Sequence, residues 1–298
     1  EKIFKNKVMP TLNKPMMRIL TSIPGVNKLI YGKVRATLLN TFGGNLRSIV
    51  LGGAAISLPV EKVMRKIRLP YTVGYGMTEC APLIGYSSWE SFRLGSCGRA
   101  VDNVVVRIDS EDPYNKVGEI QAKGISLMSG YYKNEEATKS AFTEDGWFRT
   151  GDLGYIDDKG WIYIKGRLKN MIVGPSGENI YPEDIEEVLN SNKLVAESVV
   201  TEEDGKLIAL VHFDTAALEE SYDEFKFKMS VSKEQLQQKM EEIKKDLVNY
   251  VNSKVNRFSK ISKVVDNEGE FEKTPTKKIR RFIYDRSNKG ANQDNEKK

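Results

Sequence analysis

Five short segments hold the residues with the greatest capacity for chemistry. In chain order they are Gly52-Gly53-Ala54, Tyr75-Gly76-Met77-Thr78-Glu79, Phe148-Arg149-Thr150-Gly151-Asp152, Gly166-Arg167-Leu168-Lys169 with the stretch from Gly177 to Glu186 after it, and Thr274-Pro275-Thr276-Lys277-Lys278-Ile279. Carboxylates accept hydrogen bonds and bind hard cations, whereas arginine and lysine only donate. This mixture suits a phosphate-bearing ligand.

Each segment alone has a plainer structural explanation. A glycine turn such as Gly52-Gly53 commonly marks close backbone packing, and Thr150-Gly151-Asp152 could be a turn with its usual Asp. Arg167 could belong to a charged linker, and Lys278 could be a solvated surface side chain. The order of all five segments is much more specific than any single one.

Strand and helix signals position the first two segments. Residues 48–51 and 71–74 are short apolar runs that each stop at a glycine, and residues 57–68 between them have helical periodicity with Ser57 as N-cap. Residues 1–40 indicate basic amphipathic helices broken at Pro10, Pro15 and Pro24. Strand, helix and strand over this length predict a parallel α/β unit within residues 1–94.

Residues 95–165 have a different pattern. Short β-rich runs at 104–108, 119–122 and 161–164 are separated by turn clusters such as Asp157 to Gly160. This spacing predicts antiparallel structure, in the form of a small barrel. Residues 1–165 are therefore expected to form one unit.

A second, smaller unit is expected over residues 166–285. Pro182 suits the first turn of a helix, with Glu183, Asp184 and Glu186 near its positive end. Residues 198–201 and 207–213 flank a Glu-Asp-Gly hairpin signal, a long helix follows through Leu236 and Val251, and residues 261–265 form another strand. Residues 286–298 are a polar tail.

The chain resembles the adenylate-forming enzymes, a superfamily that includes acyl-CoA synthetases, firefly-type luciferases and the adenylation domains of peptide synthetases. The five segments have that superfamily's order, and the resemblance runs from about Leu46 to about Arg281. The basic residues 1–45 look more like the long-chain fatty acyl-CoA synthetase branch. The resemblance implies an α/β fold class and the C-terminal part of the adenylate-forming fold: a partial parallel α/β layer plus a small β-barrel, then a mobile α+β C-terminal domain.

The resemblance also implies a nucleotide site at the C-terminal ends of the parallel strands. The glycine turn would lie against the adenine, Tyr75 would offer it an aromatic face, and Thr78 would give its hydroxyl to the α-phosphate. Glu79 would ligate Mg²⁺, and Asp152 would accept both ribose hydroxyls. The implied nucleotide-binding residues are Gly52, Gly53, Ala54, Tyr75, Gly76, Thr78, Asp152 and Arg167.

By the same resemblance, Lys278 is the catalytic lysine, acting with Thr78 and Glu79. Its ammonium would bridge the acid and the phosphate while two anions are joined. The family usually has Gly before this lysine, where the chain has Lys277. Lys169 matches the hinge position, about which the small domain would swing to withdraw Lys278. The loop that would then line a path for CoA comprises Gly174, Ser176, Gly177 and Glu178.

The implied reaction uses ATP, Mg²⁺, CoA and a carboxylic acid, expected to be a fatty acid. Acyl-adenylate and pyrophosphate would form first, and CoA would then give acyl-CoA and AMP. One alternative is an adenylation enzyme that loads an acyl or amino acid onto a carrier protein, which the polar tail disfavours. The other is a non-catalytic remnant, which the joint presence of Glu79, Asp152, Arg167 and Lys278 disfavours.

One segment of the family pattern does not occur in the sequence. A Ser/Thr/Gly-rich phosphate loop ending in Pro-Lys would stand upstream of Gly52, and nothing like it is present in residues 1–298. The chain also begins with Glu1 rather than Met. We therefore expect the activity to belong to a longer protein and this chain to be inactive alone.

Composition also bears on the partners and the cellular setting of the protein. The net charge of +5 is small for 298 residues and calls for no nucleic-acid partner, although the basic first residues are compatible with peripheral contact with an anionic membrane. Two cysteines without metal-ligand spacing indicate a reducing, cytoplasmic setting. The one histidine, His212, lies in an apolar run and is expected in a strand, which argues against a histidine triad or a histidine-rich metal site.

Overall fold

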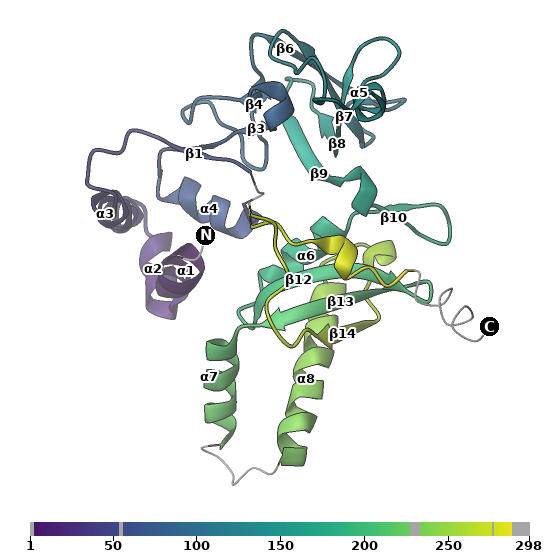
Figure 1. The fold of residues 1–298 in the computed structure, drawn as a ribbon. Coiled ribbons are helices and arrows are strands. Elements are labelled where there is room, and N and C mark those ends of the chain that lie inside the picture. The colour runs from purple at the N-terminus through teal and green to yellow at the C-terminus, as the bar shows by residue number, and fades with distance from the viewer. Residues whose placement is uncertain (1–2, 54–55, 227–232, 276, 288–298) are drawn as a thin grey trace, which may run out of the picture. The chain divides into compact units, whose positions relative to one another are not determined.

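The chain folds into two compact units, residues 1–168 and 169–298. Figure 1 shows the computed structural model, which describes residues 3–53, 56–226, 233–275 and 277–287. The sequence predicted the joint near Gly166 to Asn170, and the structure divides the units between Leu168 and Lys169. Within the described residues, no helix is long and apolar enough to cross a membrane.

Helices open the first unit. A π-helical turn (Phe4–Val8) continues directly into α1 (Met9–Asn13), and α2 (Pro15–Ser22) and α3 (Val26–Thr41) follow. Pro10 and Pro15 lie in the first turns of α1 and α2, where the absent N–H has no helical partner to lose. The break predicted at Pro10 is therefore wrong, because the proline begins α1 inside an unbroken helical run. Pro24 does lie between α2 and α3.

The predicted parallel α/β unit is present. β1 (Ile49–Leu51) pairs in parallel with β2 (Tyr71–Val73), and α4 (Leu58–Lys66) connects them. Val60, Met64 and Ile67 are buried, as the helical periodicity predicted. Ser57 is the N-cap residue of α4, as predicted, although its side chain makes no capping hydrogen bond.

Two antiparallel sheets make up the β-rich region that was expected to form a small barrel. One contains β3 (Tyr75–Gly76), β4 (Leu83–Tyr86) and β5 (Arg99–Ala100), and the other contains β6 (Val104–Asp109), β7 (Gly118–Gly124), β8 (Phe148–Ile156) and β9 (Ile162–Arg167). The helix α5 (Glu135–Ala141) lies between β7 and β8 in the chain. Ile84, Ile120 and Ile162 are fully buried in a core that both sheets share.

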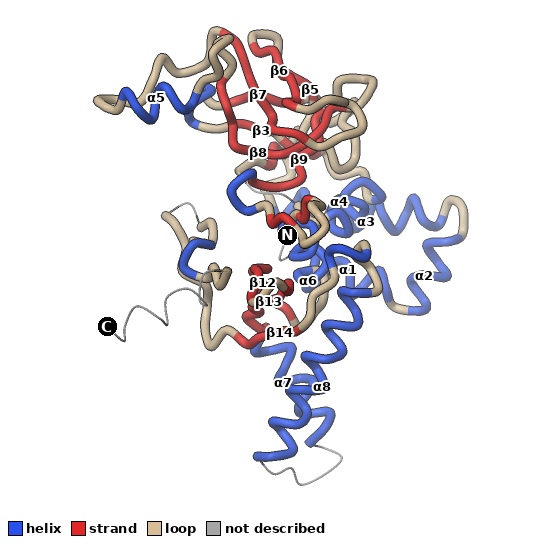
Figure 2. The backbone as a smooth tube through the Cα atoms, turned by 90° about the vertical axis from the view of Figure 1, so that its right-hand side faces the viewer, coloured by secondary structure: helices blue, strands red, loops and turns tan. Residues whose placement is uncertain are grey.

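The second unit is built on a three-stranded sheet. β12 (Val195–Glu203) and β13 (Lys206–Phe213) form the predicted hairpin, and β14 (Lys263–Asp266) pairs in parallel with β13. A short hairpin of β10 (Ile172–Val173) and β11 (Asn179–Ile180) precedes α6 (Pro182–Asn190). α7 (Thr215–Lys226) and α8 (Lys233–Asn252) lie side by side in both views (Figures 1 and 2).

Side chains alternate between the two faces of this sheet. Val200, Ala209 and Val211 face a core that includes Ile185 of α6 and Leu247 of α8. Val199, Ile208 and Leu210 point the other way and meet Phe271, Ile279 and Tyr284 from the C-terminal segment. The period of two in the strands therefore buries both faces, one under helices and one under residues 271–284.

Candidate functional site

The glycine segments after the two parallel strands meet at one edge of the first unit. Leu51 and Val73 are register partners at the ends of β1 and β2, and Gly74 N–H donates to Leu51 O at 2.8 Å. A Cβ at Gly52 would lie 3.5 Å from Gly74 O, and Gly53 has φ of +81°. Glycine thus allows a close, left-handed turn beside β2. Gly52 and Gly53 are exposed there, and Ala54 lies outside the described residues.

Tyr75 and Arg167 both hold Asp152. The Tyr75 hydroxyl donates to Asp152 Oδ2 at 2.8 Å, and Arg167 Nε is 2.8 Å from Asp152 Oδ1. Tyr75 and Asp152 are each only 6% exposed. Burial, with the Asp152 charge adding to it, raises the pKa of Tyr75, so the phenol stays a donor. Three residues from three predicted segments are therefore in direct contact.

The ring of Tyr75 faces the shared core rather than open solvent. It lies in the same cluster as Ile84 and Phe148. Its hydroxyl contact with Asp152 was not foreseen from sequence. Stacking of Tyr75 on a purine stays a prediction.

A bulge in β8 presents Asp152. Glu119 pairs with Leu153 and Gln121 with Arg149, so three β8 residues stand opposite one β7 residue. Gly151 within this bulge has φ of +68°, a conformation that glycine adopts without strain. The Thr-Gly-Asp segment is therefore part of a strand, not the free turn that was its plain structural explanation.

Glu119 holds this bulge and was missed by sequence reasoning. Its carboxylate accepts from Gly151 N–H at 3.1 Å and from Arg149 Nη1 at 3.1 Å, and the residue is 7% exposed. Thr150 contributes as well, because its hydroxyl donates to Ile120 O at 2.6 Å and accepts from Asp152 N–H at 3.0 Å. The sequence around Glu119 alternates polar and apolar residues, which is ordinary for a half-exposed strand, so it gave no signal that this carboxylate is buried.

Thr78 and Glu79 begin the short 3₁₀ turn after β3. Thr78 is exposed and Glu79 is half-buried. The Tyr131 hydroxyl donates to Glu79 Oε1 at 3.1 Å, and Met128 N–H donates to Glu79 O at 2.8 Å. Tyr131 is thus another residue that sequence reasoning missed, and it fixes the direction of the Glu79 carboxylate.

Gly76 is required by the turn that carries Thr78 and Glu79. A Cβ there would lie 1.8 Å from Pro82 O, which is closer than any real contact. Met77 N–H donates to the same carbonyl at 2.8 Å. Only glycine lets the two backbone segments approach in this way.

Glu79 is the residue in this site suited to Mg²⁺. Within the described residues, no group of three or more His, Cys, Asp or Glu side chains could hold a metal. Mg²⁺ commonly keeps several waters and uses one or two carboxylates together with substrate phosphates. A single half-buried carboxylate fits a metal that arrives with a nucleotide.

The two cysteines are structural neighbours of this site rather than reactive groups. Burial raises the pKa of Cys80 to about 11 and, together with the Asp152 charge, that of Cys97 to about 12. Both thiols are free and buried.

Because only the thiolate reacts, disulfide reagents at pH 8 should label the folded chain at least ~100-fold more slowly than the denatured chain. Rapid labelling of either thiol in the folded chain would contradict this burial.

Lys278 lies on a tight turn of the second unit. Thr274 N–H donates to Lys278 O at 2.8 Å, and Lys278 N–H donates to Thr274 Oγ1 at 3.1 Å. Lys278 is exposed, and Lys273 and Ile279 form an antiparallel bridge at the base of the turn. Residue 276 lies outside the described residues. We call residues 273–279 the lysine turn.

Lys277 has a backbone conformation that favours glycine. Its φ is +60°, in the left-handed region, and its N–H donates to Thr274 O at 2.8 Å. A non-glycine residue pays roughly 1 kcal/mol there. The structure thus gives a physical reason for the glycine that adenylate-forming enzymes usually have before their lysine.

The loop predicted to line a CoA path closes the β10–β11 hairpin. Gly174 N–H donates to Glu178 O at 2.8 Å, and Gly177 has φ of +83°. Ser176 N–H donates to Glu178 Oε2 at 3.1 Å. Pro175, Ser176 and Gly177 are exposed at the tip.

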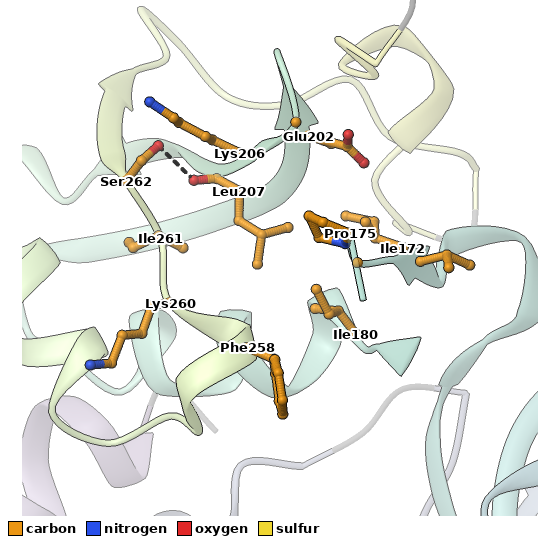
Figure 3. Close-up of a pocket in the computed structure, with 13 residues that line it drawn as sticks. Ile172, Pro175, Ile180, Glu202, Lys206, Leu207, Phe258, Lys260, Ile261 and Ser262 are labelled. Carbon is orange, nitrogen blue, oxygen red and sulfur yellow. Dashed lines mark hydrogen bonds between the residues drawn. The ribbon is translucent and has the colours of Figure 1, made fainter. Parts of the chain in front are cut away.

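A pocket of about 310 Å³ adjoins this loop within the second unit. Gly174, Pro175, Leu207 and Ile261 belong to its lining (Figure 3). The ammonium groups of Lys206 and Lys260, two further lining residues, lie on the same side of it in that view. Glu202 lines the pocket as well, so its lining combines apolar side chains with charged groups of both signs.

Lys169, predicted as the hinge, is the first residue of the second unit. It is exposed and lies in a 3₁₀ turn (Leu168–Asn170). Next to it, Asn170 Nδ2 donates to Glu183 Oε1 at 2.7 Å. The chain is thus fastened to α6 immediately after Lys169. His212 lies in β13, as expected.

Similar proteins are known for much of this chain. Residues 8–132 match the family model described as AMP-binding enzyme. A long-chain-fatty-acid–CoA ligase of Mycobacterium bovis is 36% identical over 194 residues, which are 65% of this chain and 30% of that protein. A 2-succinylbenzoate–CoA ligase of Bacillus licheniformis is 40% identical over 168 residues, 55% of this chain and 35% of that protein.

A solved structure has the same fold over most of the chain. It is the o-succinylbenzoate CoA synthetase of Bacillus subtilis in complex with its acyl-adenylate intermediate, with a TM-score of 0.63 and 27% identity, and the match covers 82% of this chain and 48% of that one. The same enzyme has been solved with ATP and a magnesium ion. This chain spans about a third of the length of the two curated relatives and about half of the solved one.

Proposed function

We propose, from the premise that this chain belongs to the superfamily of adenylate-forming, AMP-binding enzymes, that it is the C-terminal part of an AMP-forming acyl-CoA synthetase. The fold is the C-terminal part of the adenylate-forming fold. We call the longer protein that would contain this chain the parent enzyme. The parent would join a carboxylic acid to CoA at the expense of ATP.

One observation carries the proposal: a continuous set of contacts joins the predicted nucleotide-binding segments. It runs from Leu51 and Gly52 through Gly74 to Tyr75, then to Asp152 and Arg167. Leu51, Gly52 and Gly74 lie at the C-terminal ends of the parallel strands β1 and β2, where α/β proteins bind ligands, and Asp152 and Arg167 reach Tyr75 from the antiparallel strands β8 and β9. A glycine edge next to an anchored carboxylate suits an adenosine, with the base at the glycines and the ribose at Asp152.

In the first half-reaction, an oxygen of the acid attacks the α-phosphorus of ATP. A carbon–oxygen–phosphorus bridge forms, the α–β phosphoanhydride bond breaks, and pyrophosphate leaves. Asp152 would accept from the ribose hydroxyls, Thr78 would donate to the α-phosphate, and Lys278 would donate to both anions as they meet. Mg²⁺, held by Glu79 and the phosphates, would neutralise part of the phosphate charge.

In the second half-reaction, the sulfur of CoA attacks the acyl carbon of the adenylate. The thioester bond forms, AMP leaves with the bridging oxygen, and the thiol proton is released. Rotation about Lys169 would withdraw Lys278 and bring the loop of residues 174–178 to the site. The unit boundary at Lys169 and the fastening of Asn170 to Glu183 support a pivot there. The pocket beside that loop, with both apolar and charged lining residues, supports the passage of the CoA arm nearby.

The finer proposal is that the acid is a fatty acid. The match to the fatty-acid ligase of Mycobacterium bovis over 194 residues and the basic residues 1–45 support it, while 2-succinylbenzoate–CoA ligases match 168 and 203 residues of this chain at 40% and 35% identity. An aromatic dicarboxylate is therefore the second candidate substrate. Loading of a carrier protein would use the same nucleotide site with a different thiol.

An AMP-release assay on the parent enzyme tests this function. Acetate, octanoate, palmitate, benzoate and 2-succinylbenzoate would each be supplied with ATP, with and without CoA. We expect sustained AMP release with palmitate that requires CoA, and no release by this chain alone. Preference for 2-succinylbenzoate would favour the second candidate substrate. AMP release that ignores CoA would argue against CoA as the acceptor, and no release with any acid would overturn the proposal.

A further inference from the structure

A buried ion pair fastens the segment that follows the lysine turn. Arg281 Nη2 donates to Glu186 Oε2, and Glu186 Oε1 accepts from Val200 N–H at 2.6 Å. Glu186 is 7% exposed. Burial raises the pKa of Glu186 to about 7, the neighbouring Glu183 charge adds to this, and Arg281 and the Val200 N–H oppose it. A carboxylate buried to this extent needs its cationic partner to offset the cost of removing its charge from water.

The same arginine lies near the chain that leads out of the hinge. Glu183 Oε1 is 4.0 Å from Arg281 Nη2 and accepts the amide hydrogen bond of Asn170. Asn170 directly follows Lys169. Glu183 and Glu186 are both on α6, so one helix holds the hinge end and the Arg281 end together.

Ion pairs lie on both sides of the lysine turn. On its N-terminal side, Lys273 pairs with Glu197 at 2.8 Å, with both side chains about a quarter exposed. On its C-terminal side, Ile279 packs on the sheet and Arg281 enters the buried pair. Removing one partner of a buried ion pair costs far more folding free energy than removing one partner of a partly solvated pair. Arg281 is therefore the stronger of the two polar anchors.

We propose that Glu186 and Arg281 are positioning residues for Lys278, and that with Glu183 and Asn170 they bind the lysine turn and the hinge end to α6 as one rigid piece. The lysine turn then moves together with α6 when the unit rotates at Lys169, so the Lys278 ammonium reaches the same position each time. This inference rests on the proposed function. The residues concerned touch neither substrate nor reacting atoms. In this inference, α6 is the rigid element that connects the hinge at Lys169 to the segment carrying Lys278.

Half-reaction kinetics of the parent enzyme separate positioning from simple folding. Arg281→Met should lower kcat for adenylate formation by roughly 10- to 100-fold, the scale expected when a catalytic group is displaced by about 1 Å. Thioester formation from supplied acyl-adenylate should change less than about twofold, because Lys278 is withdrawn during that step. Arg281→Lys should restore part of the adenylation rate.

Arg280 provides the matched control. It is the preceding arginine, and its pair with Glu272 at 3.3 Å is solvated, with side chains 44% and 61% exposed. Arg280→Met should leave both half-reactions within about twofold of wild type. Equal loss of both half-reactions in Arg281→Met would overturn the inference, and so would no loss in either.

Hydrogen exchange tests the same claim without catalysis. In Arg281→Met, the amides of Thr274 and Lys278 should exchange at least about tenfold faster, while those of β13 keep their protection; in Arg280→Met neither set should change. Unchanged exchange in the turn would contradict the anchor. If wild-type parent forms no adenylate, the proposed function fails, and exchange alone still decides whether Arg281 holds the turn.

Discussion

Lys278→Ala in the parent enzyme should abolish acyl-adenylate formation and leave thioester formation from supplied acyl-adenylate largely intact. Loss of one preorganised donor from a site where charge develops costs on the order of 100- to 1,000-fold in rate. In the structure Lys278 is exposed on the lysine turn, so truncation of its side chain should not unfold the second unit. Pyrophosphate release and thioester formation would be measured separately.

Lys277→Gly is the matched control for this prediction. Because Lys277 has φ of +60°, glycine suits its backbone better, and adenylate formation should be unchanged or slightly faster. A defect in Lys277→Gly as large as that in Lys278→Ala would mean that Lys277 is the lysine that reaches the nucleotide. Equal loss of both half-reactions in Lys278→Ala would argue against a lysine that acts in only one of them.

Asp152→Asn should lower kcat/KM for ATP by about 100-fold, mostly through KM. An asparagine has one acceptor oxygen, so its NH₂ group must face a donor, either the Tyr75 hydroxyl or Arg167. A buried charged hydrogen bond lost in this way costs roughly 1.5–3 kcal/mol, and the ribose contact is lost in addition. Steady-state kinetics with varied ATP, and a thermal melt for stability, would measure the two effects.

Tyr75→Phe is the graded comparison. It keeps the buried ring and removes only the hydroxyl donor, so the loss in kcat/KM for ATP should be about tenfold or less. If Asp152→Asn left the KM for ATP unchanged, Asp152 would be a structural residue of the β8 bulge and not a ribose ligand. A loss of thermal stability in Asp152→Asn without a change in the KM for ATP would support the same structural role.

Local patterns predicted the elements that depend on neighbours in the chain. The buried face of α4 (Val60, Met64, Ile67), the parallel pairing of β1 with β2, and the hairpin of β12 and β13 all follow from periodicity and turn residues. The Pro10 break was wrong because proline begins helices as readily as it ends them.

Features that depend on register or on distant partners were not predictable in the same way. The bulge that presents Asp152 arises from the pairing of β7 with β8, and its support, Glu119, is 32 positions from Gly151. Glu186 and Arg281 are 95 positions apart. From the sequence, Glu186 was expected near the positive end of a helix. In the structure it is the buried partner of Arg281. The C-terminal segment that carries Arg281 packs on β12, the strand beside α6, and this packing brings the two side chains together.

A crystal structure of the parent enzyme with its acid and a non-hydrolysable ATP analogue tests most directly whether Lys278 reaches the nucleotide. We expect the Lys278 ammonium within about 3 Å of an α-phosphate oxygen, with Asp152 accepting from the ribose hydroxyls. Another lysine in that place, or an adenosine bound away from Gly52, Tyr75 and Asp152, would contradict this expectation.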